Sequence, residues 1–467
     1  MSRRVVVIGG GLAGIAAAVR LADEGWNPIV LETRKKLGGR ATSFPDHRSG
    51  QSLDNCQHVL MGCCTALLSL YDRLGVSDQI EWHESLYWQR EDGGVDLLKP
   101  GMLPAPLHTA RSFGRMKLLD RSGKSEIRRA MWKLLRGGHR LRQDYRGRTF
   151  GEFLSDLNQS AETIRLFWDT VIISACNLPC HQVAAEHGMQ VFQEAFLPGR
   201  WAGTMGLSMV PLADLYDPAE SIILEAGGAL RLGCSVREIC LEQKRAVGVM
   251  TADSMERGDA VISTVPPDRL AKLLRDDVRA QDRRLAHLED FQFSPILGVH
   301  LHFAEQIMEL PHLVLAGRPV HWIFNKGVDG QGRQHLHAVI SAADEWMSLD
   351  EGEILERVMD EVRMALPMSE GLEPITVRAV KEKRATFSAT PEIEPHRPGA
   401  GPGAIGVKGG DVESLFIAGD WCDTGWPATM EGAVRSGYRA AGAFAGTDPG
   451  IEEVPAGWLA HRLGVDR

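Results

Sequence analysis

The sequence predicts an α/β fold. A Rossmann-like parallel sheet, assembled from separate parts of the chain, is joined to an α+β domain built on an antiparallel or mixed sheet. Three observations lead to this prediction. A strand, a glycine-rich turn, a helix and a second strand follow one another within residues 5–40. A further strand and helix lie at 413–441. Between them, residues 294–303, 321–325 and 335–341 read as strands.

The first unit begins with an apolar run, Val5–Ile8, which suits a buried parallel strand. Gly9, Gly11 and Gly14 follow in G-x-G-x-x-G spacing. In such a unit the first glycine allows a sharp turn, the second lets the backbone approach a pyrophosphate, and the third lets the helix pack on the strand. The Ala-rich stretch from residue 12 to about residue 23 is the expected helix. The order of these parts predicts a dinucleotide site.

Further residues of this unit extend the site. The helix begins at Leu12 and Ala13, so unpaired backbone N–H groups and the positive end of the helix dipole face the phosphates. Glu32 ends the second strand, where an acid can accept both ribose hydroxyls and repels a 2′-phosphate. Gly39 and Arg40 follow in a second glycine pair with an arginine, which resembles FAD enzymes of the amine oxidase and phytoene desaturase type. The resemblance implies that the arginine reaches the FAD phosphates.

The second unit lies near the other end of the chain. An apolar strand is closed by Gly419 and Asp420, and a helix opens at Thr429 and Met430. This pattern resembles the C-terminal flavin motif of the same superfamily. There the strand-end acid binds the ribityl–phosphate region, and N–H groups at the helix start meet the isoalloxazine ring. Val236 resembles the family residue whose backbone pairs with adenine. Together the two units predict FAD.

Composition agrees with an ordinary globular protein. The 467 residues have a net charge of −9, which disfavours nucleic acid as a partner. The start resembles a signal peptide, but we assign that apolar run to the first strand and helix. No stretch has the length and apolarity of a transmembrane helix. The eight cysteines include no C-x-x-C pair and no zinc-like spacing, so we expect reduced thiols, no metal and a cytoplasmic protein.

We expect two domains and a tail. The predicted boundaries are 1–75, 212–290 and 405–447 for the FAD-binding domain, 76–211 and 291–404 for the substrate-binding domain, and 448–467 for the polar C-terminal tail. Within the second domain, His300, His302, His335 and His337 fall in the strand-like runs. We expect them on alternating faces of a sheet above the flavin, where strand alternation explains them better than a metal site.

Two further sequence motifs point to one subgroup of this superfamily. Residues 54–58 read D-N-C-Q-H and residues 419–432 read G-D-W-C-D-T-G-W-P-A-T-M-E-G. Both resemble the hydroxysqualene dehydroxylases, a subgroup of squalene-associated FAD enzymes. Cys56 stands where that subgroup usually has glycine, and Cys422 where it often has threonine. The resemblance extends over nearly the whole chain.

The resemblance implies a peripheral FAD-dependent oxidoreductase that converts hydroxysqualene to squalene for hopanoid synthesis. The flavin would carry the hydride, and the protein would orient the substrate, exclude water and supply an acid. The candidate acids are Asp54, His58 and Asp423. A carotenoid-type desaturase, a flavin amine oxidase and a lipid-escort protein without flavin stay open as alternatives. The sequence shows no second nucleotide motif, so the electron donor is open.

Residues 111–148 differ in character from the rest of the chain. They hold thirteen Lys or Arg against three acids, with apolar residues interleaved. A basic amphipathic surface with an aromatic residue is typical of proteins that lie on a membrane, and related phytoene desaturases take a lipid substrate from the bilayer. We therefore expect this segment to face membrane lipid, and the protein to be cytoplasmic and peripherally membrane-associated. A solvated basic face is the alternative.

Overall fold

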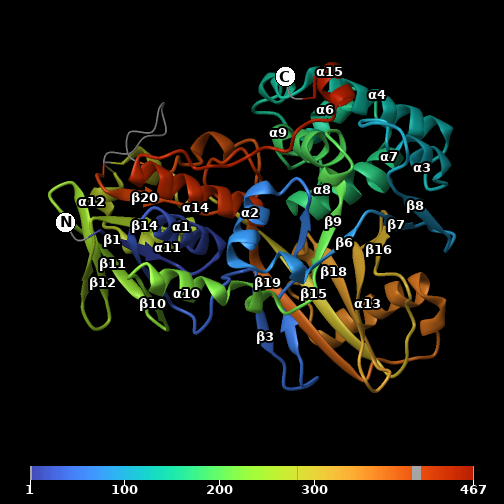
Figure 1. Ribbon diagram of the computed structural model, residues 1–467. Coiled ribbons are helices and arrows are strands. Elements are labelled where there is room, and N and C mark those ends of the chain that lie inside the picture. Colours follow the sequence, from blue (N-terminus) through green and yellow to red (C-terminus); the bar gives the residue numbers. More distant parts are fainter. Residues whose placement is uncertain (1–2, 281, 402–411, 466–467) are drawn as a thin grey trace.

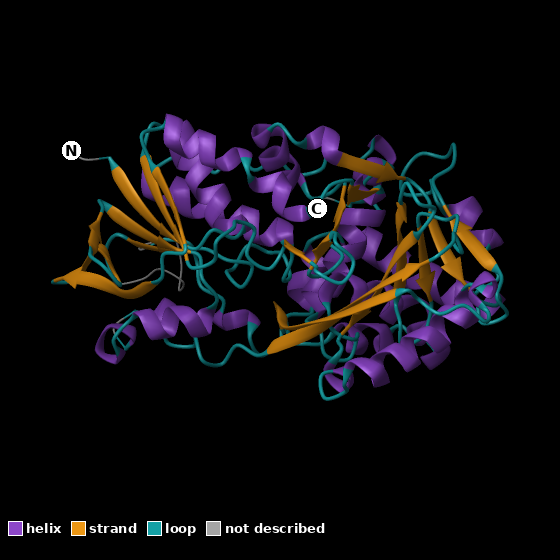
Figure 2. Ribbon diagram, turned by 90° about the horizontal axis from the view of Figure 1, so that it is seen from below, coloured by secondary structure: helices purple, strands orange, loops and turns teal. Residues whose placement is uncertain are grey.

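The computed structural model of the chain describes residues 3–280, 282–401 and 412–465. The predicted domain boundary between 404 and 405 lies outside these residues. The strands gather in two groups at opposite ends of the molecule, with helices packed around and between them (Figure 2). The N-terminal end lies beside the parallel sheet and the C-terminal end beside the helices of residues 110–190 (Figure 1).

The first group is a five-stranded parallel sheet. Its order is β10 (Ala229–Leu232), β2 (Asn27–Glu32), β1 (Arg4–Ile8), β14 (Ala260–Ser263) and β20 (Leu415–Ile417). The central strand β1 is apolar and almost fully buried, as expected for a parallel sheet covered on both faces. Three helices pack on or beside it: α1 (Leu12–Asp23), α10 (Pro218–Glu225) and α14 (Met430–Ala445). The predicted Rossmann-like sheet is confirmed.

The two helices that carry the predicted cofactor motifs pack closely. A Cβ atom added at Gly437 of α14 would lie 2.3 Å from the carbonyl oxygen of Ala13 in α1 and 2.9 Å from Ala16 Cβ. Only glycine allows this approach. The N-terminal and C-terminal units are therefore joined through a backbone contact in addition to the sheet.

The second group is a mixed seven-stranded sheet. Its order is β19 (Thr376–Phe387), β15 (Phe293–Phe303), β18 (Gln334–Ser341), β17 (Trp322–Val328), β16 (His312–Leu315), β7 (Leu86–Gln89) and β8 (Val95–Leu98). All neighbours are antiparallel except β16 and β7. One face packs its apolar side chains against α13 (Glu351–Ala365), which begins with a capping box at Asp350 and Glu353.

The other face of this sheet carries all four histidines named above. His300 lies opposite His337, and His302 lies opposite His335. Residues two apart on a strand, and residues directly opposite in an antiparallel pair, point to the same side. The expectation of alternating faces is therefore wrong, and the four imidazoles stack on one side of β15 and β18.

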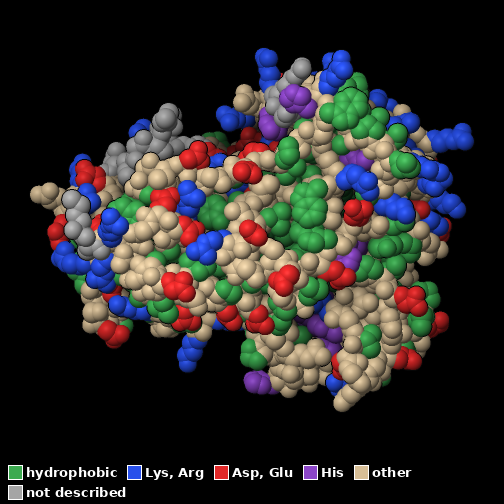
Figure 3. Space-filling model, viewed as in Figure 1, with side chains coloured by type: hydrophobic (Ala, Val, Ile, Leu, Met, Phe, Trp, Pro, Cys, Tyr) green, Lys and Arg blue, Asp and Glu red, His purple; other side chains and the backbone are tan. Residues whose placement is uncertain are grey.

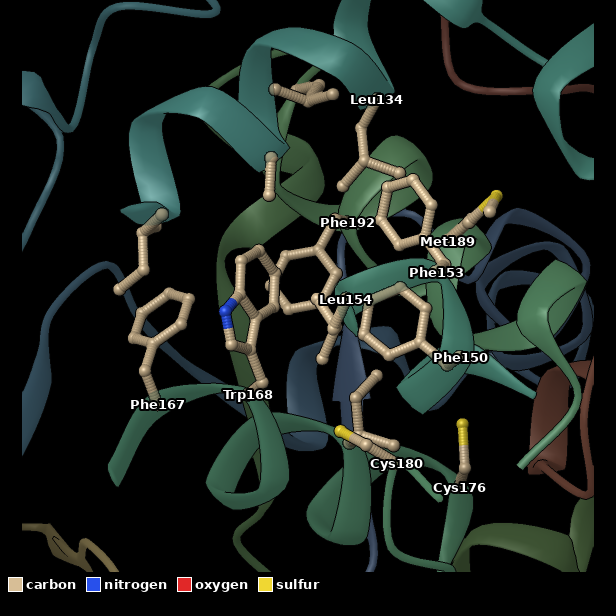
Figure 4. Close-up of a cluster of buried hydrophobic side chains, with 14 of the residues drawn as sticks. Leu134, Phe150, Phe153, Leu154, Phe167, Trp168, Cys176, Cys180, Met189 and Phe192 are labelled. Atoms are coloured by element: carbon tan, nitrogen blue, oxygen red, sulfur yellow. The ribbon is translucent and has the colours of Figure 1, made fainter. Parts of the chain in front are cut away.

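A helical layer adjoins this sheet. Its helices are α3 (Ala110–Arg115), α4 (Arg121–Gly137), α5 (Arg140–Asp144), α6 (Phe150–Asp156), α7 (Ala161–Thr163), α8 (Asp169–Cys176), α9 (Ala185–Gln190) and α15 (Trp458–Leu463). Phenylalanines of α6 and of the segments after α7 and α9 surround Trp168 at its centre (Figure 4). Ala460 of α15 is buried in the same cluster. The predicted tail thus contributes to the core.

The remaining elements connect these units. They are β3 (Ser43–Pro45), β4 (Ser52–Asp54), β5 (Val59–Met61), α2 (Thr65–Leu74), β6 (Ile80–His83), β9 (Met205–Ser208), β11 (Val236–Glu242), β12 (Arg245–Thr251), β13 (Met255–Arg257), α11 (Pro267–Leu273) and α12 (Asp276–Arg279), with short 3₁₀ and π turns between. Among the residues that the structure describes, no helix is long and apolar enough to cross a membrane.

The structure corrects the prediction for residues 111–148. Met116, Leu119, Leu134, Leu135 and Leu141 are buried in the helical core, so they cannot form an outward apolar face. The basic residues do lie outside, and they gather along the edge of the molecule formed by α3 and α4 (Figure 3). The amphipathic pattern mainly reflects packing of these helices on the rest of the protein.

Candidate active site

The turn between β1 and α1 forms a cradle without side chains. Gly9 has a φ of +105°, and a Cβ atom on Gly14 would lie 1.9 Å from the Gly9 carbonyl oxygen. Gly11 precedes α1, has no capping side chain, and no acid lies in the first turn. The N–H groups of Leu12 and Ala13 at the helix start are therefore left for a ligand. This arrangement fits a pyrophosphate.

Glu32 stands at the end of β2 beside this cradle and is 8% exposed. Its carboxylate accepts hydrogen bonds from Gly10 N at 2.6 Å and from Arg34 N at 2.7 Å. The backbone carbonyl of Glu32 accepts from Cys234 N at 2.8 Å, which brings the start of β11, at Val236, to the same end of the sheet. The predicted ribose acid and the predicted adenine contact thus lie near each other.

The second glycine pair lies directly against the first motif. Gly38 N donates to Gly10 O at 2.8 Å, and a Cβ atom on Gly39 would lie 3.0 Å from Gly11 Cα. Arg40 then forms an ion pair with Asp420 and donates to the Ala385 carbonyl in β19 at 3.0 Å. Arg40 therefore meets both the C-terminal motif and the seven-stranded sheet.

The C-terminal motif is held by local hydrogen bonds. Gly419 N donates to Ser436 Oγ at 2.7 Å, which fixes the strand end on α14. Thr429 caps α14 by accepting from Gly432 N at 3.1 Å, so that Met430 is the first helical residue. The helix start and the strand-end acid Asp420 belong to the same short segment. This segment can supply N–H groups and a carboxylate to one ligand.

Sequence reasoning missed Arg397, which supports this segment from beneath. Its guanidinium is fully buried and donates to the carbonyl oxygens of Asp420 at 3.2 Å, Cys422 at 2.5 Å and Trp426 at 2.7 Å. Glu394 balances its charge at 3.0 Å. Only its position in the loop before the motif could have drawn attention to it. Trp421, the next residue after Asp420, is buried in the core, and its indole N–H donates to Val265 O at 3.1 Å.

Asp54, in the D-N-C-Q-H segment, is almost completely buried. One carboxylate oxygen accepts from Ser43 Oγ at 2.7 Å and from Leu212 N at 3.1 Å, and the other lies 3.4 Å from Lys326 Nζ. Its backbone carbonyl accepts from His300 Nε2 at 2.9 Å. These contacts suit a charged carboxylate that anchors the segment to β15 and β17.

One ring nitrogen of His58 already makes a hydrogen bond within the protein. Its Nδ1 lies 3.0 Å from the Cys56 carbonyl, which can only accept, so Nδ1 carries the hydrogen and Nε2 is an acceptor in the neutral ring. Burial lowers the pKa of His58. Burial also raises the pKa of the Cys56 thiol next to it. Both groups are therefore neutral at pH 7.

The three predicted acids do not form one group. Asp54 and His58 are neighbours, and the charge of Asp54 acts on the His58 ring. Asp423 lies within the C-terminal motif, in the loop between Asp420 and α14, where its N–H donates to Pro398 O at 2.9 Å and its carbonyl accepts from Arg439 Nη1 at 2.9 Å. Arg439 is more than two turns into α14, away from the helix start.

The face of the seven-stranded sheet that meets Asp54 carries both polar and aromatic side chains. Glu382 lies on β19, His300 on β15 and Lys326 on β17. The same strand β17 carries Trp322 and Phe324, whose stacked rings have centroids 5.3 Å apart. Trp322 is half-buried, and its indole N–H donates to Ser174 Oγ at 2.7 Å. Polar groups next to the D-N-C-Q-H segment are thus followed by aromatic rings on one strand.

One group of side chains in the described part of the chain has metal-ligand spacing: Glu186, His187 and Glu394. Arg397 Nη1 lies 3.1 Å from His187 Nε2 and 3.0 Å from Glu394. The guanidinium already supplies the positive charge that these acids need. This group therefore fits an ion-pair network better than a metal site.

Comparison with known proteins decides the family. The family model described as flavin containing amine oxidoreductase matches residues 12–444. The chain belongs to this family. It is an FAD-dependent oxidoreductase, and the cradle, Glu32 and the C-terminal motif give FAD a fitting set of backbone and carboxylate groups. When bound, FAD supplies hydride transfer.

Relatives of this oxidoreductase carry two kinds of name. Hydroxysqualene dehydroxylases from Sinorhizobium fredii and Rhodopseudomonas palustris are each 28% identical, and the matches cover 94% of this chain and 98% of theirs. A 15-cis-phytoene desaturase from Narcissus pseudonarcissus is 26% identical, with 94% of this chain and 78% of the relative covered. Putrescine oxidase has the same fold, with a TM-score of 0.71 at 17% identity over 96% of this chain and 99% of its own.

Proposed function

We propose that this oxidoreductase removes the hydroxyl group of hydroxysqualene reductively and so provides squalene for hopanoid synthesis. One observation carries the proposal: the sheet face beside the cofactor motifs carries both polar groups and stacked aromatic rings. An allylic alcohol on a long isoprenoid needs hydrogen-bonding groups at the reacting carbon and apolar contacts along its chain. Lys326, His58 and Glu382 suit the first requirement, and Trp322 and Phe324 suit the second.

The dehydroxylase relatives support this choice. The dehydroxylases from Sinorhizobium fredii and Rhodopseudomonas palustris are 28% identical and are matched over 98% of their length, against 26% and 78% for the phytoene desaturase from Narcissus. A hydrocarbon substrate would give the charged residues near Asp54 no polar group to bind. A desaturase is therefore the second candidate. An amine oxidase is less well supported, because Tyr438, near the C-terminal motif, is buried in the core with Tyr71 instead of facing a ligand.

The experiment is an anaerobic single turnover. The purified protein is photoreduced, so that no electron donor has to be known, and is mixed with hydroxysqualene in detergent. Reoxidation of the flavin band together with squalene, detected by mass, is the expected result. If the reduced protein stays reduced but the oxidised protein is bleached by phytoene, the enzyme is a desaturase and the proposal fails.

We also propose that the protein meets membrane lipid through a patch of exposed apolar residues, one of which belongs to 111–148, rather than through the buried apolar residues of that segment. The patch consists of Met102, Leu103, Leu107, Trp132 and Trp458. These residues are neighbours, because α15 packs on α4 and a Cβ atom added at Gly457 would lie 3.7 Å from Ala105 Cβ. Exposed cations of α4 surround it: Arg121, Arg128, Arg129, Lys133 and Arg136. Apolar side chains within a basic rim suit an anionic lipid surface.

A further inference from the structure

Glu382 is an acid in the proposed site that none of the sequence motifs contains. It lies on β19 directly opposite Ile296 of β15, which places its side chain on the same face of the sheet as His300. Arg40 donates to the Ala385 carbonyl further along β19, and a Cβ atom added at Gly298, opposite Val380 on the same pair of strands, would lie 3.5 Å from the Asn55 carbonyl oxygen. The carboxyl group is therefore close both to the D-N-C-Q-H segment and to the arginine that joins the two cofactor motifs.

The carboxyl group of Glu382 differs from those of the neighbouring acids because it makes few hydrogen bonds. Within residues 3–280, 282–401 and 412–465, its one hydrogen bond comes from Arg384 N to Oε1 at 3.3 Å. Its second oxygen accepts from no described group. Arg384 directs its own guanidinium to Asp268 instead. The half-buried Glu382 thus has an oxygen to offer to a ligand.

The other candidate acids near Glu382 already have hydrogen-bond or ion-pair partners. Asp54 accepts from Ser43 and Leu212 and is paired with Lys326. Asp420 is paired with Arg40. The His58 ring donates through Nδ1 and is held neutral by burial, so its free Nε2 accepts rather than donates. None of these groups has a proton ready for a leaving hydroxyl group.

We propose that Glu382 is the catalytic acid that protonates the departing hydroxyl group, an inference that rests on the proposed function. The allylic C–O bond breaks, and the oxygen takes the Glu382 proton and leaves as water. The new C–H bond is formed by a hydride from reduced flavin, so the carbon is reduced and the flavin is oxidised by two electrons. Solvent returns the proton to Glu382.

The test compares two leaving groups in the wild-type protein and in Glu382→Gln. Hydroxysqualene needs a proton to lose water, whereas its acetate ester loses acetate without one. Each is mixed anaerobically with photoreduced protein, and flavin reoxidation is followed. In Glu382→Gln we expect reoxidation by the alcohol to slow by about 10²- to 10⁴-fold. Reoxidation by the ester should change by no more than a few-fold. Lys383→Gln, the exposed neighbour on the same strand, is the matched control and should behave as wild type.

Further measurements on the same proteins do not depend on turnover. FAD content and the dissociation constant of hydroxysqualene for the oxidised protein, measured from the flavin spectrum, should be nearly the same in both proteins. Infrared difference spectra on binding the alcohol should contain a protonated carboxyl band that Glu382→Gln lacks and Asp54→Asn keeps. The absence of that band in wild type would overturn the assignment.

The outcomes separate the two proposals. If wild type does not convert hydroxysqualene, the proposed function fails and the role of Glu382 fails with it. If wild type converts it and Glu382→Gln does so equally fast, the function stands and another group is the acid. Equal slowing of alcohol and ester would mean that Glu382 only shapes the site. Both of these last results overturn the inference.

Discussion

Arg40 and Asp420 lie 380 positions apart in the sequence and form an ion pair between the two cofactor motifs. Arg40 also donates to the Ala385 carbonyl of β19. One guanidinium thereby connects the glycine turn, the C-terminal flavin segment and the seven-stranded sheet. The site is therefore held in shape by charge as well as by the packing of Gly437 on α1.

The ion pair predicts the effect of Asp420→Asn. The change removes the charge that orients Arg40, and a hydrogen bond to a charged group contributes about 1.5–3 kcal/mol. We expect the dissociation constant of FAD to rise about ten- to a hundredfold. Titration of apoprotein by flavin fluorescence measures it. Glu351→Gln, which alters the exposed pair with Arg48, should leave the constant unchanged. Unaltered FAD affinity in Asp420→Asn would contradict the role of the pair.

The contact between α1 and α14 predicts that Gly437→Ala destabilises the protein. The new methyl group would lie 2.3 Å from Ala13 O, so the helices must separate. We expect the free energy of unfolding to fall by about 1–3 kcal/mol. Gly114→Ala is the control, because nothing lies within 4 Å of its added Cβ atom and alanine favours a helix. Urea unfolding measures both. A neutral Gly437→Ala would show that the helices have room to move.

The buried histidines predict that stability depends on pH. Burial lowers the pKa of His300 and His312 to about 4 and that of His335 to about 2. In the unfolded chain these rings have a pKa of about 6.5 and bind protons first. The free energy of unfolding should therefore have its full value above about pH 6.5. It should fall as the pH decreases toward 4, by up to about 1.4 kcal/mol per pH unit for each ring.

His335→Gln tests this pH dependence. Glutamine keeps an N–H for His300 Nδ1, which lies 2.9 Å from His335 Nε2, but does not titrate. Urea unfolding at several pH values should show a shallower decrease for this variant. His47→Gln, at an exposed position, should keep the wild-type slope. Identical slopes in all three proteins would exclude His335 as a source of the pH dependence.

The hydrogen bonds of Arg397 predict that even a conservative substitution there lowers the stability of the protein. Lysine keeps the charge, but one ammonium group cannot reach the carbonyls of Asp420, Cys422 and Trp426 together. We expect Arg397→Lys to lower the free energy of unfolding by about 2 kcal/mol or more, because buried carbonyls lose their donors. FAD should also dissociate faster. Arg275→Lys, an exposed pair with Asp277, is the control. Thermal unfolding with and without FAD separates the two effects.

The exposed apolar patch predicts binding to anionic vesicles. Met102→Ser with Trp132→Ser should reduce flotation with such vesicles about tenfold, and added salt should weaken binding of the wild type. Met364→Ser with Met368→Ser is the matched control, because these side chains are equally open but lie elsewhere, at the end of α13 and just after it. Equal flotation of both double variants would remove the patch as the lipid contact.

Much of the fold followed from local patterns. The turn at Gly9–Gly14, the strand ending in Glu32 and the helix opening at Thr429 each depend on a few neighbouring residues, so their sequence is enough to predict them. The sequence predicted that an antiparallel or mixed sheet is present, because alternation within a strand indicates a half-buried sheet. It did not predict how the strands pair. The position of Glu382 beside the D-N-C-Q-H segment depends on that pairing.

Two predictions were wrong for different reasons. An amphipathic pattern shows that a helix has an apolar side but not what covers it. The pattern of residues 111–148 was therefore interpreted as a lipid-facing surface, whereas Leu134 and Leu135 pack in the core. Side chains two residues apart on a strand point to the same face. This rule places His300 and His302 on one face, and the prediction of alternating faces did not apply it. Arg397 could not be found from sequence, because its contacts are carbonyl groups and any residue can supply those.

The order of strands in the parallel sheet bears on how the protein is made. β1 is synthesised long before its sheet neighbour β14, and β20 completes the sheet only after residue 417 has been synthesised. The exposed edge of the half-built sheet must therefore stay protected while the segments between these strands are made. Cells that make this protein faster than chaperones can shield the nascent chain should accumulate it as aggregates, and slower translation or lower temperature should increase the yield of yellow protein.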